Sequence, residues 1–338
     1  MKAIAYYAPG ALARDDALLD IELPDPVPGA RDLLVEVRAI SVNPVDTKVR
    51  ASAQPADGEA KVLGWDAAGV VRAVGSAVTL FQPGDAVFYA GSITRAGANS
   101  ELHVVDERIV GRKPTSLDFA QAAALPLTAI TAWELLFDRL GVARDGGEGQ
   151  ALLVVGAAGG VGSILVQLAR QLTRLKVIAT ASRAETAQWV RALGAHDVID
   201  HSLPLAGELQ RIGVPEVALI ASLTHTDAHF DQLLEAIAPQ GRLALIDDPA
   251  VLDAKPLKRK SASLHWEFMF ARSMFETPDM QRQHELLDEV AALVDAGVLR
   301  TTLGEHFGTI NAANLRRAHG LLESAKAKGT IVLEGFGD

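Results

Sequence analysis

Three glycines spaced three residues apart, Gly156, Gly159 and Gly162, are the residues whose types and spacing most clearly suggest chemistry. They lie in the segment 156–162 (GAAGGVG), after the apolar run 152–155 and before a segment with helical spacing at 163–173. Glycines between a strand and a helix let a pyrophosphate approach the amides at the helix N-terminus. The spacing differs from the usual dinucleotide fingerprint, and a purely structural turn is the alternative. The strand–helix context favours a dinucleotide site, formed by Ala158, Gly159, Gly160, Val161 and Gly162.

A second informative pair, Ser182 and Arg183, stands about 20 residues beyond the glycines, at the end of the next predicted strand. An acid at this place would bind both ribose hydroxyls of NAD and would repel the 2′-phosphate of NADP. A hydroxyl with a guanidinium does the reverse, because arginine offers planar donors to phosphate. The pair predicts NADPH. In the alternative, Arg183 lies at a solvated helix start and Glu185 is the ribose acid.

The chain contains no cysteine, which excludes disulfides, thiol nucleophiles and thiolate metal sites. His225 and His229 are four residues apart and could share one helix face at a metal. In the plainer interpretation, His225 faces the cofactor cleft and His229 lies on a solvated helical turn. The sequence alone favours this second interpretation.

The net charge of −10 disfavours binding to nucleic acid over a broad surface. The basic run Lys255, Lys258, Arg259 and Lys260 could touch an anionic partner, although a solvated loop is the simpler interpretation. The start of the chain does not resemble a secretory signal, so we expect a cytoplasmic protein without a membrane partner.

The elements that must position these residues fall into two predicted domains, an expected number for 338 residues. Residues 1–125 show short strands separated by Gly and Pro turns, and residues 297–338 return to strands with one helix. An Ala- and Leu-rich stretch with helical spacing, 119–140, is broken once by Pro126 at this boundary, and residues 126–296 continue as strands alternating with helices. Such alternation predicts a parallel sheet covered by helices on both faces. The predicted class is α/β.

Several motifs resemble the medium-chain dehydrogenase/reductase superfamily over nearly the whole chain. The segments 41–46 (SVNPVD), 122–128 (AAALPLT) and 329–333 (GTIVL) are similar to its quinone oxidoreductase branch. The segments 137–140 (FDRL), 222–227 (SLTHTD) and 264–270 (LHWEFMF) resemble a bacterial subgroup labelled zinc-type alcohol dehydrogenase-like. The resemblance implies a GroES-like catalytic domain made of both chain ends, with a Rossmann domain between them. It also implies a homodimer joined through the Rossmann sheets, near residues 264–270.

The zinc dehydrogenases of this superfamily hold their catalytic metal with a cysteine and a Gly-His-Glu motif. Here Asn43 stands in place of the cysteine, and Gly64-Trp65-Asp66 replaces the motif, so a thiolate and an imidazole are both missing. We therefore expect no zinc. The alternative is a metal with unconventional ligands such as Asp66 or His225.

The remaining site residues come from strand ends and from the resemblance. Parallel sheets bind cofactors at the carboxyl ends of their strands, which nominates Ser222, Leu223, Thr224, Ile246 and Asp247. His201, after the short strand 197–199, belongs to the predicted cofactor set. The resemblance implies that Asn43, Thr128, Phe268 and Met269 lie near the nicotinamide, with dimer packing as the alternative for the last two.

For the substrate wall we nominate Asp46, Trp65, Tyr89 and His225, and for catalysis Asn43, Asp46 and Tyr89. Tyr89 could donate a proton, or it could be a core tyrosine at a strand end. Trp65 could stack on a flat acceptor, or it could fill the volume of an absent metal and its ligands. No single acid or base stands out.

The expected activity is NADPH-dependent reduction of quinones or α,β-unsaturated carbonyls. Without a metal, hydride addition to a conjugated acceptor is easier than reduction of an isolated carbonyl, because hydrogen bonds suffice for the developing oxyanion. One alternative is a zinc-type alcohol dehydrogenase with unusual ligands. Another is a non-catalytic module that senses the cofactor or binds RNA.

Overall fold

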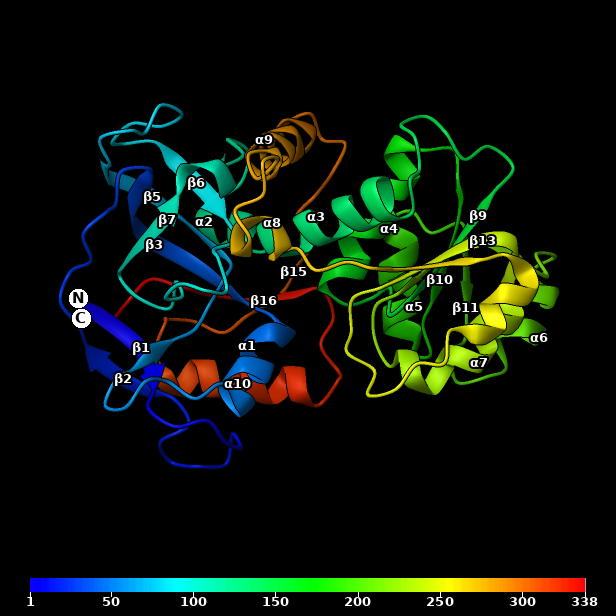
Figure 1. Ribbon diagram of the computed structural model, residues 1–338, viewed down its shortest axis with the longest axis horizontal. Coiled ribbons are helices and arrows are strands. Elements are labelled where there is room, and N and C mark those ends of the chain that lie inside the picture. Colours follow the sequence, from blue (N-terminus) through cyan, green and yellow to red (C-terminus); the bar gives the residue numbers. More distant parts are fainter. Residues whose placement is uncertain (338) are drawn as a thin grey trace. The chain divides into compact units, whose positions relative to one another are not determined.

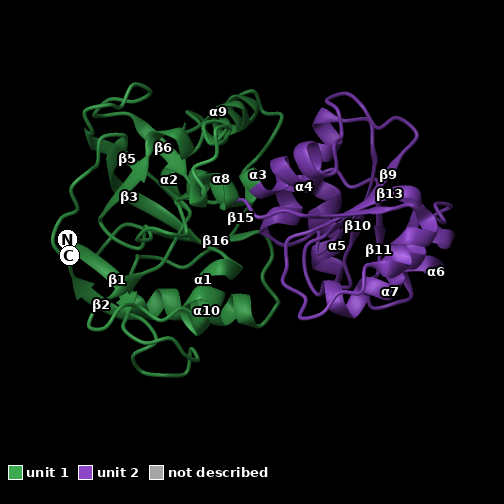
Figure 2. Ribbon diagram, in the orientation of Figure 1, with its two compact units in different colours: residues 1–130, 270–338 green, residues 131–269 purple. Residues whose placement is uncertain are grey.

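The computed structural model describes residues 1–337 of the chain, which divide into two compact units (Figure 2). Residues 1–130 and 270–337 form unit 1, and residues 131–269 form unit 2. The predicted domain bounds were 125/126 and 296/297. The second bound differs most, because helix α9 (Arg282–Asp295) packs on strand β8 (Val110–Arg112) and on the turn Glu107–Ile109 of unit 1.

Unit 1 is built on two sheets. The smaller is antiparallel, in the order β2 (Leu19–Glu22), β1 (Lys2–Tyr6), β4 (Lys61–Val62). The larger has the order β15-β16-β3-β5-β6-β8, with β7 also paired to β3. Its remaining bounds are β3 (Asp32–Val42), β5 (Ala67–Val74), β6 (Ala86–Tyr89), β7 (Leu102–Asp106), β15 (Leu303–His306) and β16 (Thr330–Glu334).

The 11-residue strand β3 is central to this larger sheet. One of its edges pairs with β5, and the other is divided between β7, along residues 32–36, and β16, along residues 39–42. Strands from both ends of the chain therefore meet on β3. Helices α1 (Pro44–Ser52), α2 (Phe119–Ala123), α8 (Ala271–Met274) and α10 (Ala312–Glu323) accompany these sheets (Figure 1).

Unit 2 contains a six-stranded parallel sheet in the order β11-β10-β9-β12-β13-β14. The strands are β9 (Ala151–Val155), β10 (Lys176–Thr180), β11 (Asp197–Ile199), β12 (Val217–Ser222), β13 (Ile237–Leu245) and β14 (Ser263–Trp266). In chain order this is three-two-one-four-five-six, the strand order of the dinucleotide-binding fold. The order reverses between β9 and β12. The predicted Rossmann sheet and the α/β class are confirmed.

Helices connect these strands: α4 (Gly160–Leu172), α5 (Ala184–Ala192), α6 (Leu205–Arg211) and α7 (Thr226–Ala236). The core between sheet and helices is aliphatic, with Leu153, Ile178 and Ile220 among its fully buried members. Every residue of β9 is buried, as expected for a central parallel strand covered on both faces. The turn after β9 is thus held by the most buried strand of the unit.

The stretch Phe119–Arg139 is helical and breaks before Pro126, as predicted, and its end is a π-helical turn that the sequence did not predict. It forms α2, then α3 (Pro126–Trp133) and a π-helical turn at Glu134–Arg139, with Pro126 at the first position of α3. By length and hydropathy it could cross a membrane, but 83% of its most apolar window is buried inside the structure. Burial of that degree is typical of a core helix.

Candidate functional site

The glycine turn joins the end of β9 to the start of α4, where the sequence predicts it. Gly156 has a φ of 78°, and a side chain there would place its Cβ 2.9 Å from Thr224 Cγ2. A Cβ on Gly162 would lie 2.5 Å from both Ala157 Cα and the Gly156 carbonyl oxygen. Both positions therefore require glycine, the first for its backbone angle and the second for close packing of helix against turn.

Gly159 has a different reason to be small. A Cβ there would meet only the Gly156 carbonyl oxygen, at 3.6 Å, so the space beside it is open. Gly159 is the N-cap of α4 and has no side chain to cap the helix. The first helical bond of α4 runs from the Ser163 amide to the Gly159 carbonyl, at 2.9 Å. The amides of residues 160–162 come before this bond in the chain. These amides and the positive end of the helix dipole fit a pyrophosphate.

Two hydroxyls that sequence reasoning missed hold this turn. Thr180, the last residue of β10, accepts a bond from the Gly156 amide at 3.2 Å. Ser163 accepts a bond from the Trp189 indole of α5 at 2.8 Å, which ties α5 to α4. A polar residue closing an otherwise apolar strand, as Thr180 does, is the signal that could have found the first of them.

Ser182 and Arg183 lie where the sequence predicts, between β10 and α5, and both are exposed. The Arg183 carbonyl begins α5 by accepting bonds from the Thr186 hydroxyl and the Ala187 amide, each at 2.9 Å. Glu185, the alternative ribose acid, is exposed in the first turn of the same helix. Both candidates for ribose recognition, the Ser182–Arg183 pair and Glu185, therefore lie where such a role requires.

The residues after β12 and β13 are engaged with one another. Thr226 donates to Asp247 through its amide, at 2.8 Å, and through its hydroxyl, at 2.5 Å. The Ser222 hydroxyl is 2.7 Å from that of Thr226 and is fully buried. The Leu223 amide donates to Val155 at 3.1 Å, and Ile246 is half-buried. Of the predicted cofactor residues here, Ser222 and Asp247 have structural partners that hold the start of α7.

Three histidines gather at the same edge of the sheet. His225 is exposed, adopts a left-handed φ of 51° and has its Nδ1 2.7 Å from the Thr224 hydroxyl. His229, on α7, packs its ring edge to face against His201, with centroids 6.1 Å apart. Within residues 1–337, no three His, Asp or Glu side chains are placed to hold a metal ion. His229 thus faces His201, which the sequence did not predict.

Phe268 and Met269 follow the edge strand β14 at the end of unit 2. Phe268 is 47% exposed, whereas Met269 is 4% exposed. Their predicted place beside a nicotinamide remains a prediction.

In unit 1, Asn43 lies in a buried polar cluster between β3 and α1. Its carboxamide donates to Asp66 at 3.0 Å, and Asp66 also accepts the Leu127 amide at 3.2 Å. Asp46 receives the Asn43 amide at 2.7 Å and the Gly64 amide at 2.9 Å on its two carboxylate oxygens. Burial raises the pKa of Asp46 to about 7, and burial also raises the pKa of Asp66 well above its usual range.

These contacts give Asp46 and Asp66 positioning roles. Both oxygens of Asp46 accept backbone bonds, one at the start of α1 and one from Gly64, and its predicted catalytic role stays a prediction. Asp66 fixes the Asn43 carboxamide, a link that the sequence did not predict. The Thr128 hydroxyl, which donates to Leu125 at 3.0 Å within its own helix, lies one residue after the amide that Asp66 binds.

Two residues of the predicted substrate wall, Tyr89 and Trp65, are fully buried. Tyr89 is fully buried in β6, with its hydroxyl 3.0 Å from His103 Nδ1. His103 Nε2 faces the Ala96 carbonyl at 3.0 Å and so carries the proton, and burial lowers the pKa of His103 to about 4. The Tyr89 hydroxyl must therefore donate to His103. Its burial and its bond to His103 favour the alternative in which Tyr89 is a core tyrosine.

Trp65 is also fully buried. Its indole donates to the Ser92 carbonyl at 3.0 Å, and its ring packs edge to face against Phe270 with centroids 6.1 Å apart. The structure supports the alternative in which Trp65 fills volume.

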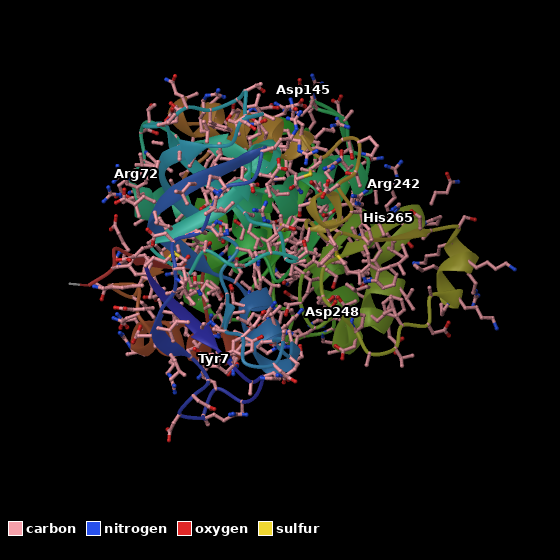
Figure 3. All side chains as sticks on the ribbon, turned by 60° about the vertical axis from the view of Figure 1, so that its left-hand side comes forward. Tyr7, Arg72, Asp145, Arg242, Asp248 and His265 are labelled. Atoms are coloured by element: carbon pink, nitrogen blue, oxygen red, sulfur yellow. The ribbon has the colours of Figure 1, made fainter. Side chains whose placement is uncertain are left out.

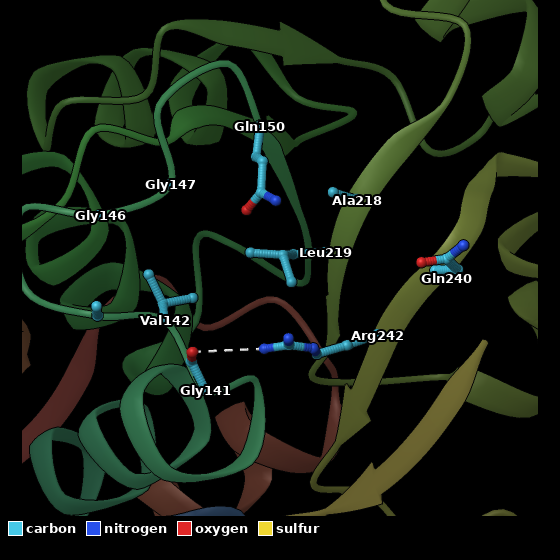
Figure 4. Close-up of a pocket in the computed structure, with 10 residues that line it drawn as sticks. Gly141, Val142, Gly146, Gly147, Gln150, Ala218, Leu219, Gln240 and Arg242 are labelled. Carbon is cyan, nitrogen blue, oxygen red and sulfur yellow. Dashed lines mark hydrogen bonds between the residues drawn. The ribbon is translucent and has the colours of Figure 1, made fainter. Parts of the chain in front are cut away.

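Unit 2 also has a pocket of about 190 Å³ at the opposite end of its sheet (Figure 4). Gln150, which precedes β9, and Arg242 of β13 both line it, and Arg242 donates there to the carbonyls of Leu140 and Gly141. The glycine turn follows β9, so β9 separates this pocket from the turn. The pocket is therefore not the predicted cofactor site.

Comparison with known proteins agrees with this arrangement. A model of the alcohol dehydrogenase GroES-like domain matches residues 29–115, and a zinc-binding dehydrogenase model matches residues 193–333. A zinc-type alcohol dehydrogenase-like protein of Staphylococcus aureus is 39% identical over 98% of this chain and 99% of its own length.

Two solved structures extend the comparison. One, from Rhizobium etli CFN 42 and named for a zinc-dependent alcohol dehydrogenase, is 59% identical with a TM-score of 0.96, covering 100% of this chain and 99% of its own. The other is the Escherichia coli quinone oxidoreductase complexed with NADPH. It is 26% identical with a TM-score of 0.83, covering 99% of this chain and 100% of its own.

The second and third glycines of the turn, Gly159 and Gly162, allow a matched test. Gly162→Ala should lower the free energy of unfolding by about 2 kcal/mol, because its Cβ meets backbone atoms that cannot move independently. Gly159→Ala should lower it by no more than about 1 kcal/mol, because alanine is a poorer N-cap but its Cβ has open space. It should nevertheless weaken NADP⁺ binding, because the added methyl occupies the space beside the helix amides.

Urea unfolding and calorimetric titration with NADP⁺ measure the two effects. Unchanged NADP⁺ affinity in Gly159→Ala would place the pyrophosphate elsewhere.

Proposed function

The chain belongs to the medium-chain dehydrogenase/reductase superfamily and is an oxidoreductase of it, and we propose that it uses NADPH to reduce quinones or α,β-unsaturated carbonyls without zinc. The observation that carries this proposal is the glycine turn at the point where the strand order of unit 2 reverses. The E. coli structure of similar fold, named a quinone oxidoreductase with NADPH, supports it.

NADPH supplies the hydride when bound, and the residues of unit 2 supply its binding site. The amides of residues 160–162 would hold the pyrophosphate, while Ser182 and Arg183 would hold the 2′-phosphate. Asn43 and Thr128 are proposed to lie near the nicotinamide only because of the family resemblance. The bonds from Asp66 to Asn43 and to the Leu127 amide give both residues a fixed position.

The absence of zinc is proposed from the chemistry of the donor set. Asn43, Trp65 and Asp66 offer one amide, one indole and one carboxylate, and the chain has no cysteine. Zinc sites in proteins prefer thiolate, imidazole and carboxylate ligands, usually three or four of them. The relative and the structure that are named for zinc favour the competing function, a metal-dependent alcohol dehydrogenase.

A single assay separates these functions. The purified chain is mixed with NADPH and a panel of benzoquinones, enones and simple aldehydes, with and without a chelator, and its zinc content is measured. We expect oxidation of NADPH by quinones or enones, unaffected by the chelator, with no stoichiometric zinc. Activity only with aldehydes or alcohols, lost on chelation, would refute the proposal.

The choice of NADPH over NADH is tested by Arg183→Ala, with Arg191→Ala on the exposed side of the same helix as control. A charge-assisted bond to phosphate contributes about 1.5–3 kcal/mol, so the Kd for NADPH should rise about 10- to 100-fold. The Kd for NADH should change by less than about twofold because NADH lacks that phosphate. Calorimetric titration measures both, and equal losses for the two nucleotides would contradict the assignment.

We further propose that the chain forms a homodimer through β14, without nucleic-acid or membrane partners. β14 lies at the edge of its sheet and pairs only with β13, so its outer backbone groups can pair with a second copy. Arg242 on β13 and His265 on β14 are labelled in Figure 3. Trp266 on β14 is 54% exposed and would be covered by the partner strand.

Trp266→Glu should convert the protein to a monomer in multi-angle light scattering, because a charge would be buried without a partner. Phe275→Glu, at a 71% exposed aromatic residue of unit 1, should leave the dimer intact. A wild-type monomer, or a dimer that survives Trp266→Glu, would remove β14 as the interface. The proposed compartment is the cytoplasm.

A further inference from the structure

The pocket of unit 2 that lies at the opposite end of the sheet from the glycine turn has the lining of a small-molecule site (Figure 4). Its volume of about 190 Å³ exceeds that of an apolar cavity of about 150 Å³, which admits benzene. Val142 and Leu219 form an apolar wall, and both are buried. The polar groups of the lining are two carboxamides and one guanidinium. An apolar wall with a few polar groups is typical of sites that bind small molecules.

The guanidinium of Arg242 is held at one nitrogen and open at the other two. Its Nη1 donates to the carbonyls of Leu140 and Gly141, the second at 3.4 Å. Gly141 has a φ of 61°, and a Cβ there would lie 2.9 Å from this Nη1, so glycine lets the guanidinium approach. Within residues 1–337, Nε and Nη2 of Arg242 have no hydrogen-bond partner. These two nitrogens form the planar edge that binds both oxygens of a carboxylate.

A carboxamide and an apolar side chain complete the site around this edge. In Figure 4 the Gln150 carboxamide points into the pocket from one side and the Arg242 guanidinium from the other. The Gln150 carboxamide has no hydrogen-bond partner within the described residues 1–337. Leu219 of β12 pairs in register with Arg242 of β13, which places the apolar wall beside the guanidinium. A ligand that contacts all three groups has both an acceptor group and an apolar part.

The charge of the lining indicates the kind of acceptor. Arg242 is the one charged residue of the lining, and within residues 1–337 it forms no ion pair. Asp145 and Glu148 belong to the same connection but do not line the pocket, and Glu148 pairs with Arg174 at 3.4 Å. One guanidinium balances the single charge of a carboxylate. Inorganic phosphate has more charge and no apolar part to cover the wall.

We propose that this pocket binds a small organic carboxylate with a short apolar part, of about the size of benzoate. The carboxylate oxygens accept bonds from Nε and Nη2 of Arg242, and the Gln150 carboxamide donates to one of them. The apolar part covers Val142 and Leu219. This site is separate from the proposed reaction and does not depend on NADPH, because β9 lies between the pocket and the glycine turn.

The experiment is an NMR titration of the whole chain that observes the ligand, with benzoate, benzamide and inorganic phosphate as probes. Benzoate should bind with a Kd of about 0.1–10 mM, as expected for a molecule of its size. Benzamide has the same shape without the charge and should bind at least about tenfold more weakly. Phosphate should not displace benzoate, and saturating NADP⁺ should leave the affinity for benzoate unchanged.

Two substitutions test the location of the site. Arg242→Met removes the guanidinium, and Ala218→Leu fills the pocket while leaving Arg242 in place. Each should weaken benzoate binding at least about tenfold. Arg259→Met is the matched control, at an exposed arginine of the 3-10 turn Lys255–Lys260 outside the pocket, and should bind benzoate like the wild type.

The contrary results are equally definite. Benzoate binding that survives either pocket substitution, or that NADP⁺ displaces, would place the carboxylate elsewhere and overturn the proposal. Equal affinities for benzamide and benzoate would overturn the assignment of a carboxylate. The absence of benzoate binding at about 50 mM, well above the expected Kd, would do the same. None of these results bears on the proposed use of NADPH, which the Arg183→Ala titration tests separately.

Discussion

The glycine turn after β9 must meet two opposing requirements, close packing of helix α4 on the sheet and open access to the first amides of that helix. The helix α4 must start close enough to the sheet for Gly162 to touch Ala157, yet its first amides must stay open to a ligand. Three glycines resolve this conflict, each in a different way: backbone angle at Gly156, open space at Gly159 and close contact at Gly162. Thr180 and Thr224 then contact the turn from neighbouring strand ends.

Local features of the sequence predicted this part of the molecule well. The alternation of strands and helices, the sheet type and the position of Ser182 and Arg183 depend on residues close together in the chain. Such features follow from periodicity and from glycine placement. Helix α6 escaped prediction because its seven residues are too few to show a clear period.

The roles of single side chains were harder to predict, because burial is decided by residues far away in sequence. Tyr89 meets His103, and the Trp65 ring meets Phe270, more than 200 residues later. Asp247, a predicted cofactor ligand at a strand end, also binds Thr226 at the start of a helix. No local pattern distinguishes a carboxylate that binds a cofactor from one that begins a helix.

The division of β3 between partners from both chain ends has a consequence for synthesis. All elements of unit 2 have left the ribosome before β16, which completes one edge of β3, is translated. Unit 2 can therefore fold during translation, while β3 has unpaired backbone groups along residues 39–42 until β16 follows. For the time it takes to make about 290 further residues, at about 5–20 per second, that edge needs protection from other strands. The order in which β3 and β16 are synthesised thus sets how long this edge needs a chaperone.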